Sequence, residues 1–210
     1  MRRLFIAALA TLAMVGTQAA DNGGASASSG SGASSTSPVE VAGVKYNPVE
    51  EVGGQKLQLN GAGIRYKAIF KVYTAGLYLS GKATTPEAVL AMPGPKRLHI
   101  VALRDLDGND LGKLFYKGME SNTTREEFVK AINGVRKIGE LFATKMELKK
   151  GESFSVDYLP GTGSVVLING VRAGEVIKEP EFYGAFLHVW LGPNPPDSSL
   201  KTKLLGGVKN

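Results

Sequence analysis

The feature that most limits the fold of this chain is a long apolar run from Ala68 to Ser80. This run is rich in Tyr, Val, Phe and Leu and contains few polar residues. Such a run predicts a buried central strand. Gly76 in its middle predicts that a neighbouring group packs tightly against the backbone. Before it, Gln55 to Asn60 alternates polar and apolar residues, which predicts a second strand. Gly61 and Gly63 then predict a bulge or a close backbone approach.

Helix signals follow in four places between further strand-like segments. They are Thr85-Pro86-Glu87, the apolar spacing from Leu111 to Met119, the capping box from Thr124 to Glu127, and Pro180-Glu181. The third helix is expected to bury one face, made of Phe128, Ile132, Val135, Ile138 and Phe142. With the Asn169-Gly170 hairpin signal, this order predicts an α+β fold in which helices pack on one mostly antiparallel sheet.

The N-terminus carries the pattern of a secretory signal. Arg2 and Arg3 precede an apolar stretch from Leu4 to Val15, and the small residues Ala19 and Ala20 follow. This order predicts a signal peptide over residues 1–20 and a periplasmic or secreted protein. The apolar stretch rises only about 18 Å as a helix, too short for the hydrocarbon core of a bilayer. We therefore expect no transmembrane segment after signal removal.

Composition divides the rest of the chain into a linker and one domain, and it argues against disulfides and a nucleic-acid partner. Residues 21–38 are almost wholly small and polar, which predicts a disordered linker rich in Gly, Ser and Ala, and residues 39–210 have the size of one domain. The chain has no cysteine, so the core must hold the fold without disulfides. The net charge of +6 comes from dispersed lysines, which favours a solvated surface over a nucleic-acid partner.

Most catalytic signatures do not fit this sequence. The segment from Asp105 to Asp110 resembles the start of a calcium loop, but Asp110 stands where that loop needs glycine and Tyr116 where it needs glutamate. The two histidines, His99 and His188, have no partner at metal-ligand spacing. No nucleophile elbow and no Walker loop occurs. We therefore predict neither a metal site nor a cofactor.

Two adjacent strands carry a resemblance to a known family. The Gly-x-Gly-x-Arg pattern ending at Arg65 and the stretch from Lys71 to Leu79 resemble the chalcone isomerase-like proteins, and the likeness continues through Leu111-Gly112-Lys113 to Asn122. It covers roughly Tyr46 to Gly206. The resemblance implies an open-faced β-sandwich, in which a large antiparallel sheet carries helices on one face with a cleft between them.

The resemblance also implies a set of ligand-binding residues. Members of the family include plant isomerases that close the flavanone ring, plastid fatty-acid-binding proteins and bacterial relatives without known catalysis. Arg65 resembles the cleft arginine that meets a phenolate or a carboxylate, Thr74 the threonine near a substrate carbonyl, and Asn122 the asparagine near a substrate hydroxyl. The cleft walls are expected to include Tyr66, Phe70, Tyr73, Phe115 and Met119.

Departures from the isomerase pattern argue against ring closure. Phe115 stands where a catalytic tyrosine belongs, and Gly118 where a lysine belongs. The hydroxyl residue expected near the last hairpin falls on Val171-Arg172. Because ring closure needs an assembly that polarises the carbonyl, the sequence favours the exported, non-catalytic bacterial members of the family.

Three functions remain open from the sequence. The first is binding of an amphipathic anion, a fatty acid or a phenolic acid, with the carboxylate on Arg65. The second is a protein-interaction or structural module whose cleft is filled and whose Arg65 is in an ion pair. The third is an isomerase-type intramolecular lyase. Strict alternation places Arg65 with Lys67, Lys71 and Tyr73, but a glycine bulge would reverse this, so the side of the sheet that Arg65 faces is open.

Overall fold

A computed structural model describes residues 37–145 and 147–207. The predicted signal peptide and nearly all of the predicted linker lie outside these residues. The strands are β1 (Val39–Val41), β2 (Val44–Tyr46), β3 (Val49–Val52), β4 (Gln55–Lys67), β5 (Phe70–Leu79), β6 (Lys96–Ala102), β7 (Leu106–Asp107), β8 (Glu147–Leu148), β9 (Ser153–Leu159), β10 (Gly163–Ile168) and β11 (Val171–Arg172). The helices are α1 (Pro86–Ala91), α2 (Gly108–Asn122), α3 (Arg125–Lys145), α4 (Pro180–Leu191) and α5 (Ser198–Leu204).

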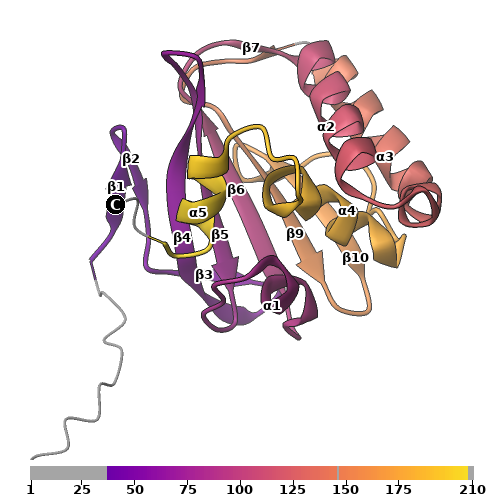
Figure 1. The fold of residues 1–210 in the computed structure, drawn as a ribbon, viewed down its shortest axis with the longest axis horizontal. Coiled ribbons are helices and arrows are strands. Elements are labelled where there is room, and N and C mark those ends of the chain that lie inside the picture. The colour runs from indigo at the N-terminus through magenta and orange to yellow at the C-terminus, as the bar shows by residue number, and fades with distance from the viewer. Residues whose placement is uncertain (1–36, 146, 208–210) are drawn as a thin grey trace, which may run out of the picture. The chain divides into compact units, whose positions relative to one another are not determined.

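Seven strands form one antiparallel sheet in the order β11-β10-β9-β6-β5-β4-β3 (Figure 1). The apolar run that begins at Ala68 becomes β5, which lies between β4 and β6, and this confirms the predicted central strand. Asn169 and Gly170 both have positive φ and form the predicted tight turn between β10 and β11. The α+β class and the antiparallel sheet are therefore as expected.

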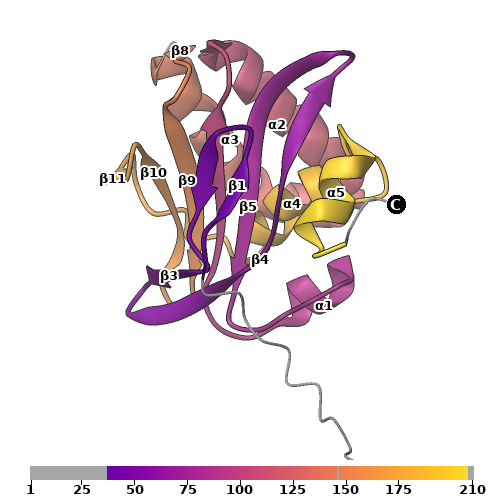
Figure 2. The ribbon, with the colours of Figure 1, turned by 90° about the vertical axis from the view of Figure 1, so that its left-hand side faces the viewer.

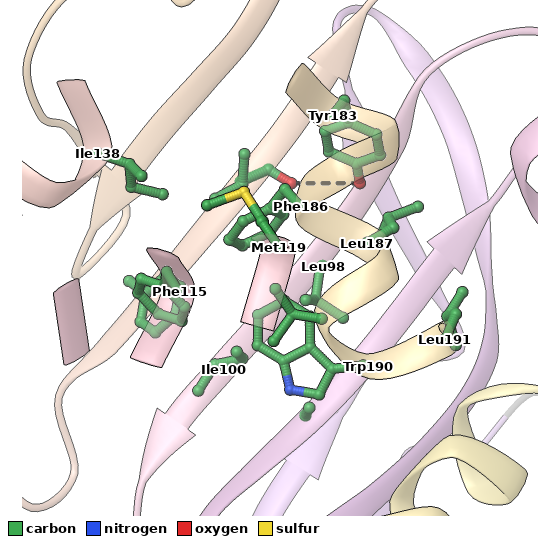
Figure 3. Packing of buried hydrophobic residues seen from close by; sticks show 14 of the residues in the cluster. Leu98, Ile100, Phe115, Met119, Ile138, Tyr183, Phe186, Leu187, Trp190 and Leu191 are labelled. Carbon is green, nitrogen blue, oxygen red and sulfur yellow. Dashed lines mark hydrogen bonds between the residues drawn. The ribbon is translucent and has the colours of Figure 1, made fainter. Parts of the chain in front are cut away.

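The helices cover one face of this sheet, as predicted (Figures 1 and 2). α4 is apolar on nearly all sides and packs against both α2 and α3 and against the sheet, so it lies at the centre of the main core. Figure 3 shows Phe115 and Met119 of α2 packed with Phe186 and Trp190 of α4 over Leu98 and Ile100 of β6. No helix within the described residues is long and apolar enough to span a membrane.

Two features of the helices differ from the expectations. On α3 the residue Ile132 is exposed, and Ala131 and Gly134 are buried instead. A Cβ on Gly134 would come within 2.5 Å of the Phe182 ring, so glycine lets α4 approach α3 closely. The helix α5 was not predicted at all. It begins after Pro196, with the side chain of Asp197 accepting hydrogen bonds from the first backbone N–H groups.

The opposite face of the sheet carries its own small cluster. The hairpin of β1 and β2 brings Tyr46 against Gly76, where any Cβ would overlap the tyrosine ring. This is the close approach that Gly76 predicts.

Gly61 and Gly63 of β4 are covered by Lys203 of α5, and the register between β4 and β5 shifts next to Gly61.

Candidate functional site

Arg65 and Tyr73 form one cross-strand pair at the centre of the candidate site. They are directly opposed in the ladder between β4 and β5, so both side chains lie on the same face of the sheet. A register shift follows immediately, because Tyr66 pairs with Lys71 and leaves Val72 unopposed. Both members of the pair point to the helix-covered face, which settles the side that the sequence left open.

A cavity of about 280 Å³ lies between this pair of residues and the helices. Its lining comprises Arg65, Tyr73, Leu111, Leu114, Phe115, Lys117, Gly118, Ser121, Val189, Trp190, Asn194 and Pro196. Two of these side chains are cationic and none is acidic. The walls are otherwise mostly apolar, which is the usual character of a small-molecule site.

The guanidinium of Arg65 has no acidic partner among the described residues. Arg65 is 8% exposed, and its Cζ lies 5.5 Å from the centroid of the Tyr73 ring, a cation–π contact. Neither an ion pair nor a side-chain hydrogen bond to it is found in the described part of the chain. A buried cation without a counter-ion is costly, so an anion that enters the cavity gains a strong interaction.

The nearby carboxylate of Asp197 is engaged by the backbone. Its Oδ1 accepts from the N–H groups of Ser199 (2.8 Å) and Leu200 (3.1 Å), and its Oδ2 accepts from the N–H of Tyr66 (2.8 Å). Asp197 thus caps α5 and ties that helix to β4 one residue beyond Arg65. Because three donors hold the carboxylate, it stays out of ion-pair distance of the guanidinium in the described structure.

The phenol of Tyr73 serves as an internal acceptor. The indole Nε1–H of Trp190 donates to Tyr73 Oη at 2.7 Å, and both rings are buried. Burial raises the pKa of Tyr73 to about 12, although the neighbouring Arg65 charge and the Trp190 hydrogen bond act to lower it. The phenol is therefore neutral at physiological pH and has no role as a base there.

On the α2 side of the cavity, the two positions where the isomerase pattern places a tyrosine and a lysine carry Phe115 and Gly118. Phe115 packs in an aromatic cluster, with its ring centroid 6.0 Å from that of Trp190. Gly118 permits close packing of α2 on α4, since a Cβ there would lie 2.8 Å from Val189 Cγ1. Tyr116 points elsewhere, against Phe128, at a centroid distance of 5.3 Å.

Two of the predicted site residues lie outside the cavity lining. Thr74 follows Tyr73 in β5 and so faces the opposite side of the sheet, where its Oγ1 accepts a 2.7 Å hydrogen bond from Tyr46. Asn122 fastens the end of α2 to the loop after α4. Its Oδ1 accepts from Asn194 N at 2.6 Å, and its Nδ2 donates to Asn194 O at 3.1 Å and to Gly118 O at 2.8 Å.

Three of the expected wall residues are also absent from the lining. Met119 is fully buried in the core, and Tyr66 and Phe70 are exposed on the hairpin beyond the cavity. Conversely, no sequence signal predicted that Trp190, Asn194 and Pro196 would close the cavity. These three residues come from α4 and the loop that follows it, which leads into the unpredicted helix α5.

A larger cavity of about 560 Å³ lies beside the first half of α4. Its cation, Lys96, already donates to Met92 O at 2.6 Å and sits 5.2 Å from the Tyr158 ring centroid. Two acidic residues, Glu127 and Glu181, also line this space. The cavity next to Arg65 is smaller but is better suited to an anion, because its lining is cationic and without acids.

Comparison with known proteins agrees with this architecture. A family model described as chalcone isomerase-like matches residues 38–206. The fold is similar to the crystal structure of a fatty-acid binding protein from Arabidopsis thaliana (AtFAP1), with a TM-score of 0.60 and 14% identity over 78% of this chain and 92% of that chain. No curated protein matches the sequence.

The antiparallel sheet with helices on one face defines an α+β domain with the chalcone isomerase-like fold. The family model spans nearly all of the described residues, and the chain belongs to the chalcone isomerase-like family.

Proposed function

We propose that this protein is an exported, non-catalytic binding protein for an amphipathic anion such as a fatty acid or a phenolic acid. The observation that carries the proposal is the Arg65 guanidinium, which faces an acid-free cavity and has no ion-pair partner among the described residues. A carboxylate accepts two parallel N–H bonds from such a group and neutralises its charge. Family membership and the fold shared with a fatty-acid binding protein support the same conclusion.

The dimensions of the cavity indicate which part of the ligand it holds. Its volume of about 280 Å³ is at the lower end of ligand sites. The carboxylate would lie on Arg65 and the first apolar segment against Phe115 and Val189. Leu114 and Lys117 line the cavity and are exposed, so the remainder of a long acyl chain would leave past them.

The proposal excludes ring closure for reasons of chemistry. Phe115 has no hydroxyl and Gly118 no side chain, at the two positions where the isomerase pattern places tyrosine and lysine. The one phenol in the lining, Tyr73, is neutral and accepts from Trp190. The site therefore offers the positive charges of Arg65 and Lys117 and apolar walls, without the tyrosine and lysine that the isomerase pattern places at positions 115 and 118.

A thermal-shift assay tests the binding site. Octanoic acid, lauric acid below its micelle concentration, and 4-hydroxycinnamic acid are each added to wild type at about 100 times their dissociation constant. Mass action then contributes about 2.7 kcal/mol, which for a domain of this size raises Tm by roughly 5–10 °C. Because hydrogen bonds to a charged group are worth about 1.5–3 kcal/mol, Arg65→Met should weaken binding roughly 10- to 100-fold.

The matched control is Arg172→Met, which removes an exposed arginine from β11. Its ligand response should equal that of wild type. If the Arg65→Met and wild-type proteins respond alike, or if no acid changes Tm, the anion site is refuted and the interaction-module alternative takes its place.

Export rests on the N-terminal pattern alone and has a separate test. Mass spectrometry of the protein recovered from its host should show a chain that begins at residue 20 or 21, after cleavage behind Ala19 or Ala20. A chain that retains residues 1–20 would contradict the export part of the proposal without affecting the ligand site.

A further inference from the structure

The hairpin between β4 and β5 extends beyond the rest of the sheet. Its last rungs pair Tyr66 with Lys71 and Lys67 with Phe70, whereas pairing of β5 with β6 ends at Tyr73. We name residues 66–71 the arm. Two hydrogen bonds hold its base, from Leu103 N to Val72 O at 3.0 Å and from Tyr66 N to Asp197 Oδ2 at 2.8 Å. In Figure 1 the arm is the dark loop at the upper end of β4 and β5.

The arm exposes large apolar side chains at its tip. Ile69 is 84% exposed, Phe70 58% and Tyr66 41%, although aromatic and aliphatic residues of this size normally pack. Ala68 has a φ of 54°, and residues 68 and 69 form the tight turn at the end of the hairpin. Scattered apolar residues on a surface are ordinary, but three of them together on a projecting turn mark an interaction site.

Cations surround these apolar side chains. Lys67 and Lys71 are exposed within the arm, and the Cζ of Arg104 lies 5.9 Å from the centroid of the Phe70 ring. No acidic residue occurs in the sequence between Glu51 and Glu87. Two acids close to the arm are engaged with backbone groups: Asp105, next to Arg104, accepts from Lys150 N and Asp197 accepts from Tyr66 N, each at 2.8 Å.

We propose that the arm is a docking element for a negatively charged lipid bilayer. Ile69 and Phe70 would enter the region between headgroups and acyl chains, about 5–10 Å deep, with Tyr66 at the level of the headgroups. Lys67 and Lys71 would bury their aliphatic stems and keep their ammonium groups on the lipid phosphates. A lipid partner fits this surface because the apolar tip and its cationic rim belong to one six-residue segment.

Docking would bring the cavity close to the bilayer surface. Arg65 and Tyr73 are the first pair behind the arm, and Ile69 lies four positions after Arg65. At about 3.3 Å per residue this places the cavity roughly 13 Å from the tip. The inference goes beyond the proposed function and does not depend on it, since the arm's side chains are absent from the cavity lining.

Vesicle co-sedimentation tests the proposal with the protein as recovered from its host. Vesicles of phosphatidylcholine with 30% phosphatidylglycerol are compared with pure phosphatidylcholine. Wild type should bind the anionic vesicles, and Ile69→Ser/Phe70→Ser should lower the partition coefficient at least tenfold. Lys67→Gln/Lys71→Gln should lower it roughly 30-fold on anionic vesicles, at about fivefold per lysine, with little change on neutral ones.

Matched controls separate the arm from the rest of the surface. Val129→Ser/Ile132→Ser removes two exposed apolar side chains from α3, and Lys56→Gln/Lys178→Gln removes two exposed lysines elsewhere. Both should bind vesicles like wild type. Arg65→Met should also bind like wild type, so loss of the ligand site and loss of the docking element are distinguishable.

A depth measurement completes the test. Lipids with brominated acyl chains should quench a tryptophan introduced by Phe70→Trp and leave one introduced by Val129→Trp unchanged, while the buried Trp190 contributes equally to both. Equal quenching at positions 70 and 129, or equal sedimentation of wild type and Ile69→Ser/Phe70→Ser, would overturn the proposal. So would a concentration-dependent dimer that is lost in Ile69→Ser/Phe70→Ser without any vesicle binding, because the arm would then join two copies of the chain.

Discussion

Arg65 and Arg97 stand on opposite faces of the same sheet and are held in opposite ways. Arg97 of β6 donates to Asp157 of β9 through Nε at 2.7 Å and Nη2 at 2.6 Å, and its Nη1 lies 3.6 Å from Glu50. Arg65 meets an aromatic ring and an acid-free cavity instead. One guanidinium is neutralised within the fold, and the other has no acidic partner among the described residues, which is the basis of the proposed anion site. The residue type therefore says little about function until its partners are known.

The largest expected effect comes from breaking the paired arginine. Arg97→Met leaves the buried carboxylate of Asp157 without its guanidinium and should lower the free energy of unfolding by about 3 kcal/mol. Arg65→Met removes an unpaired charge and should change it by less than about 1 kcal/mol. Urea denaturation of the two variants measures both values. Similar losses in both would show that Arg65 is also a structural residue.

An intermediate effect is expected from the hydroxyl groups on the two faces. Tyr73→Phe leaves the buried N–H of Trp190 without its acceptor and should destabilise the fold by about 2 kcal/mol. Tyr46→Phe removes the donor to Thr74 on the other face and should cost about 1 kcal/mol. Calorimetry measures the Tm of both variants. A greater decrease in Tm for Tyr46→Phe than for Tyr73→Phe would contradict this expectation.

The smallest expected effect is a pH dependence to which both histidines contribute, since burial also lowers the pKa of His188 on α4, and the part that one substitution isolates is that of His99 on the Arg97 face. Burial and, secondly, the Arg97 charge lower the pKa of His99, whose Nδ1 is 2.7 Å from Ser155 Oγ. A histidine with a lowered pKa binds fewer protons when folded, so stability should decrease as the pH falls below about 6.5. His99→Gln should flatten this slope in urea titrations at pH 7 and pH 5. An unchanged slope would assign the dependence to other groups.

The sequence predicted the long strands of the main sheet and most helix starts because their signals are local, whereas the short pairs β1-β2 and β7-β8 were not predicted. The capping box is an example, since Thr124 N donates to Glu127 at 2.8 Å and Glu127 N to Thr124 Oγ1 at 3.3 Å. Gly76 likewise predicted that a neighbouring group packs tightly against the backbone. Strict alternation predicts that Arg65 and Tyr73 share one face of the sheet only if no bulge comes between them. The register shift lies immediately beyond that pair, between Arg65 and Tyr66.

The remainder of the site depends on contacts between distant segments. The helix α5 has only seven residues and a modest apolar pattern, so its docking on Gly61 and Gly63 could not be foreseen from local signals. The roles of Thr74 and Asn122 were inferred from family resemblance. In the structure both make hydrogen bonds within the fold, to Tyr46 and Asn194. Their assignment as ligand contacts stays a prediction.

The capping of α5 has a consequence for the charge inside the cavity. Asp197 is the chain's own potential counter-ion for Arg65, and only its three backbone donors keep it occupied. Any event that detaches the C-terminal helix frees that carboxylate and lets it compete with an incoming acid. The first turn of α5 thus holds a competing carboxylate away from the arginine.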